Sequence, residues 1–350
     1  MSAGALRLIE AAPEDAARWD AYVEKAGEAS LFHLFGWRRV IKAAYGYEAV
    51  YLMAEREDRI VGVLPLIDVR SGLFGRNLIS TAFTVGGGVA ADDEEARGAL
   101  ARAAVEEGRK RRVGYVELRS QRAALEGWTV KKDVYAGFAK EAAADEAKNL
   151  AEIPKRRRAD LRKGLNALSA GELAADFDSD PDIFYALYAE AARDHGTPVF
   201  PRGYLNALAG VFKDRLEILT IWAKGKPVAA LASFYFRDRT MPYYIAARAE
   251  ARAFRAQDLA LWLAMRRGVA RGAPVIDLGR SKYGAGSFDY KLHWGFAPAP
   301  LEYQYALIGA QETPNVNPDN PKFALAVSAW RRLPLPVANL AGPILARHLA

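Results

Sequence analysis

The chain has 350 residues, a net charge of +7 and no cysteine, so we expect two domains and exclude disulfides, thiolate metal sites and a cysteine nucleophile. Apolar residues make up 51% and charged residues 26% of the chain, which is typical of a globular protein with a large core. Neither a signal peptide nor a run of about 18 apolar residues is evident, so we expect a cytoplasmic protein. The positive charge fits either an anionic partner or an ordinary solubilising surface.

The first informative segment is SLFHLFGWRRVIKAAYGYE, residues 30–48, which carries five aromatic side chains. This density has two interpretations. The aromatic residues either belong to the core and dock a helix, or they line a cleft in which Trp37 contacts a substrate.

Two stretches of the chain repeat each other. Apolar runs flank the polar turn Glu57–Arg59, and a second pair flanks the turn Lys224–Lys226, which predicts two β-hairpins. Further along, YVELRS and VIDLGRS both follow a helical pattern and a glycine, and Glu117 is 160 residues before Asp277 (277 − 117). The hairpin turns are 167 residues apart (225 − 58), a similar spacing, so the sequence predicts duplicated halves.

Each half is expected to run helix, antiparallel strands, helix, strand, which is half of a mixed α+β sheet. The expected divisions are an N-terminal domain over 1–141, a joining helix over 142–174, a C-terminal domain over 175–310, and a basic amphipathic tail over 311–350.

The joining segment contains IPKRRRADLRKGLNAL, residues 153–168, which predicts a basic helix. Pro154 suits the first helical position, and the leucines share one face on which the helix can dock. Lys155, Arg158 and Arg162 fall on an adjoining face. They form either a clamp for phosphates or a solvated charged surface.

A glycine-rich loop follows the last predicted strand, in VIDLGRSKYGAGSFDYKLHWGF, residues 275–296. Its glycines have the spacing of neither a dinucleotide fingerprint nor a Walker loop. Asp277 is interpreted as a general base or, with more support, as the structural partner of Arg280. His293 is a second candidate base, although a histidine that caps a loop is commoner.

Other chemistries lack their motifs. The four histidines show no metal-binding spacing, and no G-x-S-x-G elbow is present. We therefore expect neither a metal nor a serine nucleophile.

Four stretches together resemble a known family: FHLFGWRRVI (32–41), IPKRRRADLRKG (153–164), DLGRSKYGAGSFDYKLHWGF (277–296) and WRRLPLPVANLAGP (330–343). The chain resembles the FemAB-like branch of the GNAT acyltransferases, of the type associated with exosortase and PEP-CTERM gene clusters. The similarity covers nearly the whole chain. It implies two tandem GNAT-like domains, each a mixed sheet flanked by helices.

The resemblance also implies the chemistry. An amine or hydroxyl acceptor attacks an acyl group carried by acyl-CoA or an aminoacyl-tRNA, without a metal or a covalent enzyme intermediate. Both donors stay open, because the chain has neither the long helical arm with which Fem ligases engage tRNA nor the glycine turn of single-domain GNATs. The predicted catalytic residues are Asp277, Arg280, Lys291 and His293, and the predicted substrate-binding residues are Trp37, Lys155, Arg158, Arg162, Tyr283, Ser287 and Trp294.

We expect an N-acyltransferase that acts on a glycan or lipid-linked precursor during extracellular polysaccharide or envelope assembly. The alternatives are an aminoacyl-tRNA-dependent ligase acting on a peptidoglycan precursor, and a catalytically silent tandem GNAT that binds a glycan-lipid or nucleic acid.

The tail has no acidic residue after Asp319 but keeps Lys322, Arg331, Arg332 and Arg347. Residues 322–350 are either an interfacial anchor on the anionic inner face of the membrane or a helix packed on the C-terminal domain.

Overall fold

The computed structural model describes residues 4–72, 74–119, 125–314 and 321–349, and it forms two compact units. Unit 1 comprises Met1–Val134, Leu301–Asn317 and Ile344–Ala350, and unit 2 comprises Tyr135–Pro300 and Pro318–Pro343. Ser120, which ends the first sequence repeat, and residues 315–320 of the expected tail lie outside the described residues.

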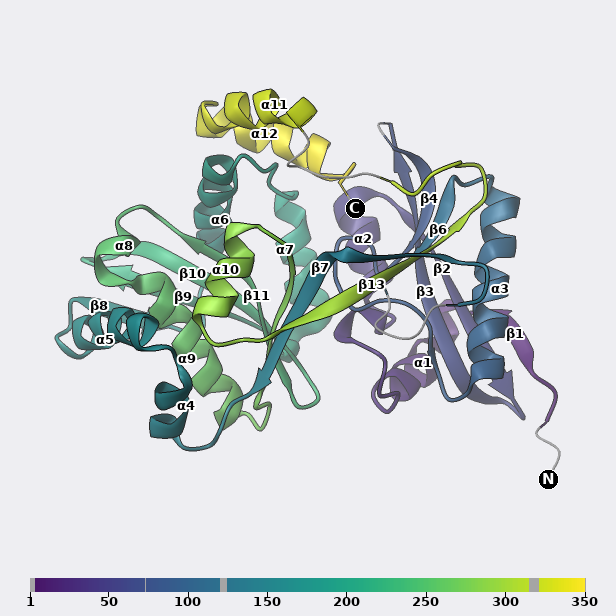
Figure 1. Ribbon diagram of the computed structural model, residues 1–350, viewed down its shortest axis with the longest axis horizontal. Helices are drawn as coiled ribbons and strands as arrows, with labels where there is room; N and C mark the ends of the chain where they lie inside the picture. Colours follow the sequence, from purple (N-terminus) through teal and green to yellow (C-terminus); the bar gives the residue numbers. More distant parts are fainter. Residues whose placement is uncertain (1–3, 73, 120–124, 315–320, 350) are drawn as a thin grey trace. The chain divides into compact units, whose positions relative to one another are not determined.

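Unit 1 is a mixed sheet in the strand order β1-β2-β3-β4-β6, with helix α3 lying along it (Figure 1). The apolar sides of α3 and of the central strands form one buried core cluster. Its main elements are β1 (Arg7–Glu10), α1 (Ala16–Val23), α2 (Trp37–Tyr45), β2 (Glu48–Arg56), β3 (Arg59–Ser71), β4 (Gly75–Ser80), β5 (Ala90–Ala91), α3 (Glu94–Arg111) and β6 (Tyr115–Leu118).

Unit 2 repeats this plan with the strand order β8-β9-β10-β11-β12. Helices α5 and α9 pack against one side of its central strands, where they share a core cluster with β9 and β10. Its main elements are α4 (Glu146–Glu152), α5 (Lys155–Ser169), β8 (Leu173–Asp176), α6 (Pro181–His195), α7 (Arg202–Phe212), β9 (Leu216–Ala223), β10 (Lys226–Phe236), β11 (Arg239–Ala247), α8 (Ala251–Phe254), α9 (Ala256–Ala270), β12 (Val275–Lys282) and α10 (Gly286–His293).

Both predicted hairpins are present and use the same turn. Glu57 and Asp58 have φ of 49° and 59°, and Lys224 and Gly225 have φ of 50° and 72°. Two consecutive residues with positive φ form the tight turn whose twist matches that of paired antiparallel strands. The common element order and the common turn confirm the duplication predicted from the sequence.

Two strands pass from one unit to the other along the chain. β7 (Thr129–Glu141) begins in unit 1, and its C-terminal half pairs with β12 of unit 2. β13 (Pro298–Leu307) begins in unit 2, and its later residues pair with β6 of unit 1. The expected boundary at residue 141 falls at the end of β7, whereas the two units divide inside this strand, between Val134 and Tyr135. The expected joining segment, 142–174, contains α4 and α5 of unit 2.

The tail contains α11 (Pro321–Arg331) and α12 (Leu335–Ala346), drawn as an adjacent pair in Figure 1. Helix α11 contacts α6. Among the described residues, no helix is long and apolar enough to cross a membrane.

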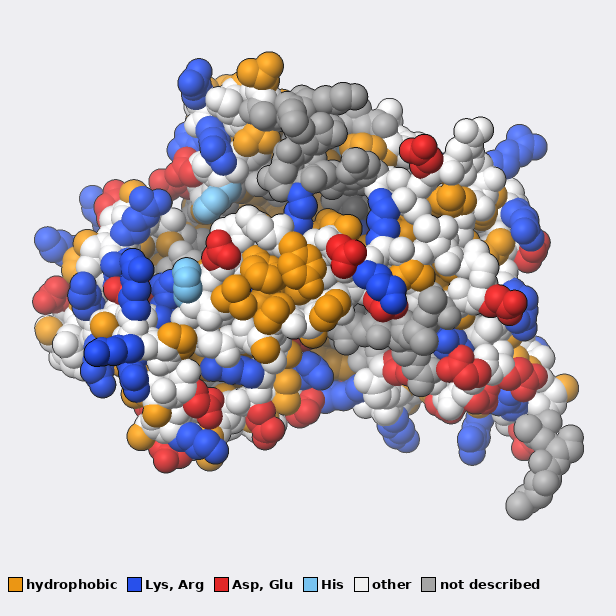
Figure 2. Space-filling view, in the orientation of Figure 1, with side chains coloured by type: hydrophobic (Ala, Val, Ile, Leu, Met, Phe, Trp, Pro, Cys, Tyr) orange, Lys and Arg blue, Asp and Glu red, His pale blue; other side chains and the backbone are white. Residues whose placement is uncertain are grey.

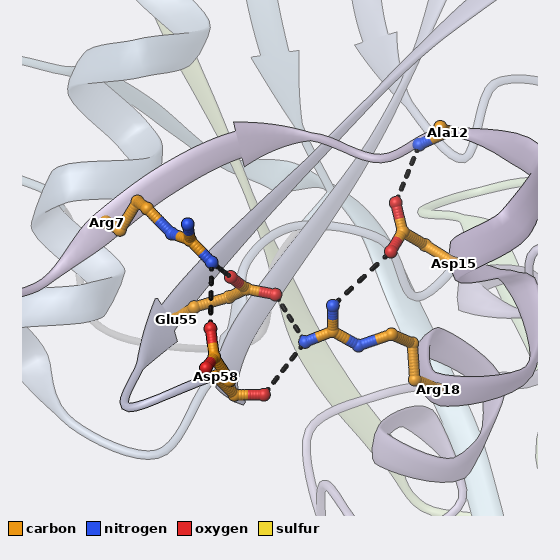
Figure 3. Close-up of polar contacts among 6 residues, drawn as sticks. All are labelled: Arg7, Ala12, Asp15, Arg18, Glu55 and Asp58. Atoms are coloured by element: carbon orange, nitrogen blue, oxygen red, sulfur yellow. Dashed lines mark hydrogen bonds and ion pairs between the residues drawn. The ribbon is translucent and has the colours of Figure 1, made fainter.

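A buried carboxylate ties the first strand of unit 1 to its first helix (Figure 3). Glu55 on β2 is almost fully buried, and it accepts hydrogen bonds from Arg7 of β1, at 2.7 Å, and from Arg18 of α1. Arg7 also contacts the exposed Asp58, and Arg18 donates to the Asp58 carbonyl oxygen at 2.9 Å. Glu55 thus anchors β1 and α1 to the β2–β3 hairpin.

We predict that Glu55→Gln lowers the free energy of unfolding by about 1–3 kcal/mol, because the buried amide has one oxygen for two guanidinium groups and turns its NH₂ toward one of them. Asp58→Asn, in the same network but exposed, is the control and should change it by about 0.5 kcal/mol or less. Urea titration measures both variants. Equal effects would contradict the anchoring role of Glu55.

Candidate active site

The sheet of unit 2 opens between β11 and β12. The two strands run parallel and pair only at Arg239–Val275 and Thr240–Ile276. β11 continues to Ala247 and β12 to Lys282. Among the described residues, the two strands form no further backbone pairs with each other beyond these positions, so each has an unpaired edge facing the other. Backbone amides at such an edge need partners, and an extended ligand with amide groups can supply them.

A bulge in β11 lies just after the point where the strands separate. Pro242 is paired with Ser233 and Tyr244 with Ala232, which leaves Tyr243 as an extra residue. A bulge bends and twists its strand, and proline has no amide to give to a ladder. These two residues give β11 a local reason to leave β12.

Aromatic rings from α6, α7 and β11 pack together next to this bulge. The Tyr204 and Tyr244 hydroxyls share a hydrogen bond of 2.8 Å, and Phe200 contacts both rings. Burial, followed by its tyrosine neighbours, raises the pKa of Tyr244 well above its usual value. The cluster is therefore uncharged at neutral pH, and its rings pack β11 against α6 and α7.

Strand β12 has its own irregularity at the predicted loop. Its register against β7 shifts between Asp277 and Arg280, and Gly279 takes φ of 62°, a left-handed conformation that favours glycine. Asp277 accepts a hydrogen bond from the Gly279 amide at 2.8 Å and forms an ion pair of 3.5 Å with Arg239. Arg239 is thus one cation beside Asp277, and the sequence analysis, which named Arg280, did not consider it.

Lys291 on α10 holds the other side of this bulge. Its Nζ donates to the carbonyl oxygens of Arg280, at 2.8 Å, and Gly279, at 3.2 Å, and it lies 5.1 Å from the Phe138 ring centroid. Burial lowers the pKa of Lys291 to about 8, and the neighbouring Asp277 acts in the opposite direction. Lys291 can therefore exchange a proton close to neutral pH.

The basic helix α5 packs against the start of α9. A Cβ on Gly164 would come within 3.1 Å of the Leu259 Cβ and 3.3 Å of the Phe254 carbonyl oxygen, so glycine permits this close approach. Asp160 of α5 also pairs with Arg255, at 3.2 Å, directly before α9. The docking side of α5 is thus fixed against α8 and α9, as its leucine pattern predicted.

The cations of α5 fall into two groups. Arg157 donates from one nitrogen, Nη1, to both carboxylate oxygens of Asp258 of α9, at 2.9 and 3.0 Å. No described acidic side chain pairs with the other five, and Lys and Arg side chains gather over α5 and α8 (Figure 2). These five are Lys155, Arg156, Arg158, Arg162 and Lys163.

Asp258 is a structural junction that the sequence analysis missed. Its buried Oδ1 also accepts hydrogen bonds from the Tyr290 hydroxyl and from Trp294 Nε1, each at 3.2 Å. One carboxylate therefore links α5, α9 and α10. The available signal was an isolated acid in the apolar run AQDLALWLAM of α9.

The remaining predicted residues divide by exposure. Tyr283, Ser287 and His293 are exposed on β12–α10, and Arg280 lies 4.5 Å from the Tyr135 ring centroid. Trp294 is fully buried, and its indole N–H donates a hydrogen bond to Asp258.

Trp37 is also fully buried, and it packs edge-on against Phe32 within unit 1. Neither predicted tryptophan offers a ring face to solvent, because both fill cores. The core interpretation of the N-terminal aromatic segment therefore holds for Trp37.

The corresponding opening in unit 1 is filled by the chain itself. β4 and β6 also pair at only two positions, Leu78–Val116 and Ile79–Glu117. Beyond them, the buried Arg119 forms a 2.7 Å ion pair with Glu117 and donates to the Thr84 carbonyl oxygen at 2.7 Å. Burial opposes the charge of Arg119, but Glu117 and nearby tyrosines outweigh it, and its pKa is raised. This contrast favours unit 2 as the active unit.

The prominent surface hollows lie elsewhere. One of about 580 Å³ borders α3 in unit 1, and one of about 500 Å³ in unit 2 is lined by Glu217, Arg267 and Arg271. Glu217 pairs with both of these arginines, at 2.9 and 3.2 Å, so the second hollow is neutralised internally. Among the described residues, no group of three histidine or acidic side chains could hold a metal ion.

Comparison with known proteins agrees with this assignment. Residues 155–292, all in unit 2, match the family model of the acetyltransferase (GNAT) domain. This segment is similar to GNAT acetyltransferase domains. A comparison with curated protein sequences gave no match.

Solved structures share the tandem fold at low sequence identity. The chain is similar to FemX, with a TM-score of 0.69 and 12% identity over 87% of this chain and 98% of FemX. It is similar to a tandem GNAT protein from the clavulanic acid biosynthesis pathway, with a TM-score of 0.56 and 15% identity over 88% of this chain and 100% of that one. A third structure is the C-terminal domain of a putative lysylphosphatidylglycerol synthetase from Agrobacterium fabrum, with a TM-score of 0.54 and 13% identity over 83% of this chain and 91% of that one. The predicted tandem GNAT-like fold is confirmed.

We predict that Asp258→Asn lowers the free energy of unfolding by about 2–4 kcal/mol, because it leaves the half-buried Arg157 without its counter-ion. Asp160→Asn removes the partner of a more exposed arginine in the same helix contact and should cost about 1 kcal/mol or less. Urea unfolding of both proteins measures the difference. A loss at Asp160 as large as that at Asp258 would contradict the central role of Asp258.

A second prediction concerns the pH dependence of stability. The folded-state pKa of Lys291, about 8, lies below the usual lysine value of 10.5, so the unfolded chain binds more protons between these values. The stability of the wild-type protein should therefore rise, relative to Lys291→Met, as pH increases from about 8 to 10.5. Urea unfolding at a series of pH values measures this difference, and parallel curves would contradict the shifted pKa.

Proposed function

We propose that the protein transfers an acyl or aminoacyl group from an anionic carrier to an amine of a glycan or cell-envelope precursor. The observation that carries the proposal is the opening between β11 and β12 in the GNAT-like domain. It is supported by the cations of α5, a helix that docks beside α9, because five of them have no acidic partner among the described side chains. The opening would receive the acyl arm of the carrier, and the cations would bind its phosphates.

The balance of charge on α5 supports the anionic carrier. Buried and half-buried acids elsewhere in unit 2 have cationic partners, as Asp258 has Arg157 and Glu217 has Arg267. Five cations of α5 have no acidic partner among the described side chains. Arginine and lysine in this state bind phosphate strongly. The GNAT fold implies acyl-CoA as the carrier, and an aminoacyl-tRNA is equally anionic.

The proposed reaction is a direct displacement. The acceptor nitrogen attacks the acyl carbonyl carbon, a C–N bond forms, and the bond from that carbon to the sulfur or oxygen of the carrier breaks. The amine loses a proton and the leaving group gains one. We assign the proton transfer to Lys291, because its pKa of about 8 permits exchange near neutral pH. Asp277 instead positions Gly279, and Arg280, Tyr283 and Ser287 line the path to the acceptor.

Two likenesses support an envelope acceptor. The sequence resembles the exosortase-associated FemAB type, which favours an extracellular polysaccharide or lipid-linked glycan precursor. FemX shares the tandem fold, which favours the second candidate, aminoacyl transfer onto a peptidoglycan precursor. With either acceptor, we place the enzyme in the cytoplasm, at the inner face of the membrane, where such precursors are assembled.

Binding of labelled acetyl-CoA and of charged tRNA to the purified full chain tests the choice of donor. Saturable binding of one identifies the carrier. Saturable binding of neither would overturn the enzymatic proposal and favour a silent module that binds a glycan-lipid or nucleic acid.

We predict that the double variant Lys155→Ala/Arg158→Ala binds the donor about tenfold more weakly at low salt, because two phosphate contacts are lost. The difference from wild type should shrink as NaCl is raised to about 0.5 M. Lys224→Ala/Lys226→Ala, in the β9–β10 turn, removes the same net charge from another part of unit 2 and is the matched control. Isothermal titration with acetyl-CoA measures all three proteins. Equal affinity of both double variants would exclude a specific clamp.

A further inference from the structure

Helix α12 buries small residues and exposes large apolar ones, the reverse of a normal amphipathic helix. Its small residues Ala338 and Gly342 are buried, and a Cβ on Gly342 would lie 3.0 Å from the Val199 amide and side chain. Its large apolar residues Leu340 and Ile344 are 77% and 61% exposed. A helix in a globular protein normally buries its large apolar residues, so this side of α12 requires a cover.

The exposed residues form one continuous stripe. At about 100° per residue, Val337, Leu340 and Ile344 lie within about 60° of one another around α12. All three are exposed, and Val337 is 47% accessible. The stripe is therefore a row of side chains along the helix rather than scattered exposure.

Helix α11 also leaves a large apolar residue exposed. It docks through Val327, whose Cγ1 would be 2.5 Å from a Cβ on Gly196, and through Arg331, which donates to the His195 carbonyl oxygen at 3.3 Å. Leu325 lies about 200° from Val327 around the helix, and it is 83% exposed. Both helices thus use one side for docking and leave leucines on another.

The charges around this surface indicate what covers it. The sequence from Pro321 to the C-terminus has no acidic residue, and Arg331, Arg332 and Arg347 are exposed beside the apolar residues. Exposed leucines in a segment whose own charged residues are all cationic fit a bilayer with anionic headgroups. A second copy fits poorly, because a two-fold contact through this face would bring each cationic border close to its own copy.

We propose that the α11–α12 pair is a docking surface for an anionic lipid bilayer. Val337, Leu340 and Ile344 enter the boundary between headgroups and acyl chains, and the arginines contact lipid phosphates. The helices lie in the plane of the surface. The inference goes beyond acyl transfer and holds for any donor or acceptor.

The test uses the full chain and flotation with two kinds of vesicle: pure phosphatidylcholine, and phosphatidylcholine with about 30% phosphatidylglycerol. We expect binding to the anionic vesicles that falls at high salt, and much weaker binding to the neutral ones. Leu340→Asp should weaken partitioning to anionic vesicles about tenfold or more. Leu8→Asp, at an exposed leucine of β1 in unit 1, is the matched control and should bind as the wild type does.

Thermal unfolding checks that Leu340→Asp stays folded, as its exposure implies, and Arg332→Glu provides a second variant that tests the charge alone. Several results would overturn the proposal: no binding by the wild-type protein, equal binding to neutral vesicles, or equal losses in Leu340→Asp and Leu8→Asp. Sedimentation that shows a wild-type dimer and a Leu340→Asp monomer, without vesicle binding, would assign the surface to a second copy instead.

Discussion

The candidate site depends on one backbone constraint, which is that β11 and β12 pair at only two positions. The bulge at Tyr243 bends β11 just after that contact, where Pro242 also has no N–H to donate to a neighbouring strand. The rest of unit 2 supports the resulting opening. β7 completes the other edge of β12, Lys291 fixes the bulge at Gly279, and the buried Asp258 ties α5 and α10 to α9. Without the early separation, the two strands would satisfy each other and leave no edge for a ligand.

The duplicated halves share this constraint and use it differently. In unit 1, Arg119 follows β6, and its guanidinium donates hydrogen bonds to Glu117 and to the Thr84 carbonyl oxygen. In unit 2, the extra residue Gly279 changes the register, and Asp277 binds a backbone amide instead. A buried ion pair gives unit 1 a filled, fixed opening, because separating its charges inside the protein would be costly. One inserted glycine therefore accompanies the difference between a scaffold and a candidate site.

Buried acids are paired with arginines, whereas the excess of cations lies on α5 and the tail. The buried acids Glu55, Glu117 and Asp258 all have arginine partners, as expected for ionised groups taken out of water. The cations of α5 outnumber the acids that could neutralise them, and the tail has arginines and no acids. The net charge of +7 is thus concentrated on two surfaces, each suited to an anionic partner. The partner that we propose for α5 is the acyl carrier, and the partner that we propose for α11–α12 is a lipid surface.

The sequence by itself determined the duplication, the hairpins, the basic helix and the irregular loop at Gly279, because each is encoded in residues close together in the chain or in a repeated spacing. It did not reveal Asp258 as a junction, whose partners Arg157 and Trp294 lie 101 and 36 residues away. It also did not point to Arg239 as a cation beside Asp277, and it offered Trp37 and Trp294 as substrate contacts although both fill cores. Helix α12 is apolar on every side, so only its packing through Ala338 and Gly342 decided which apolar residues face out. Local patterns fix local geometry, whereas burial and long-range pairing depend on which elements the folded chain brings together.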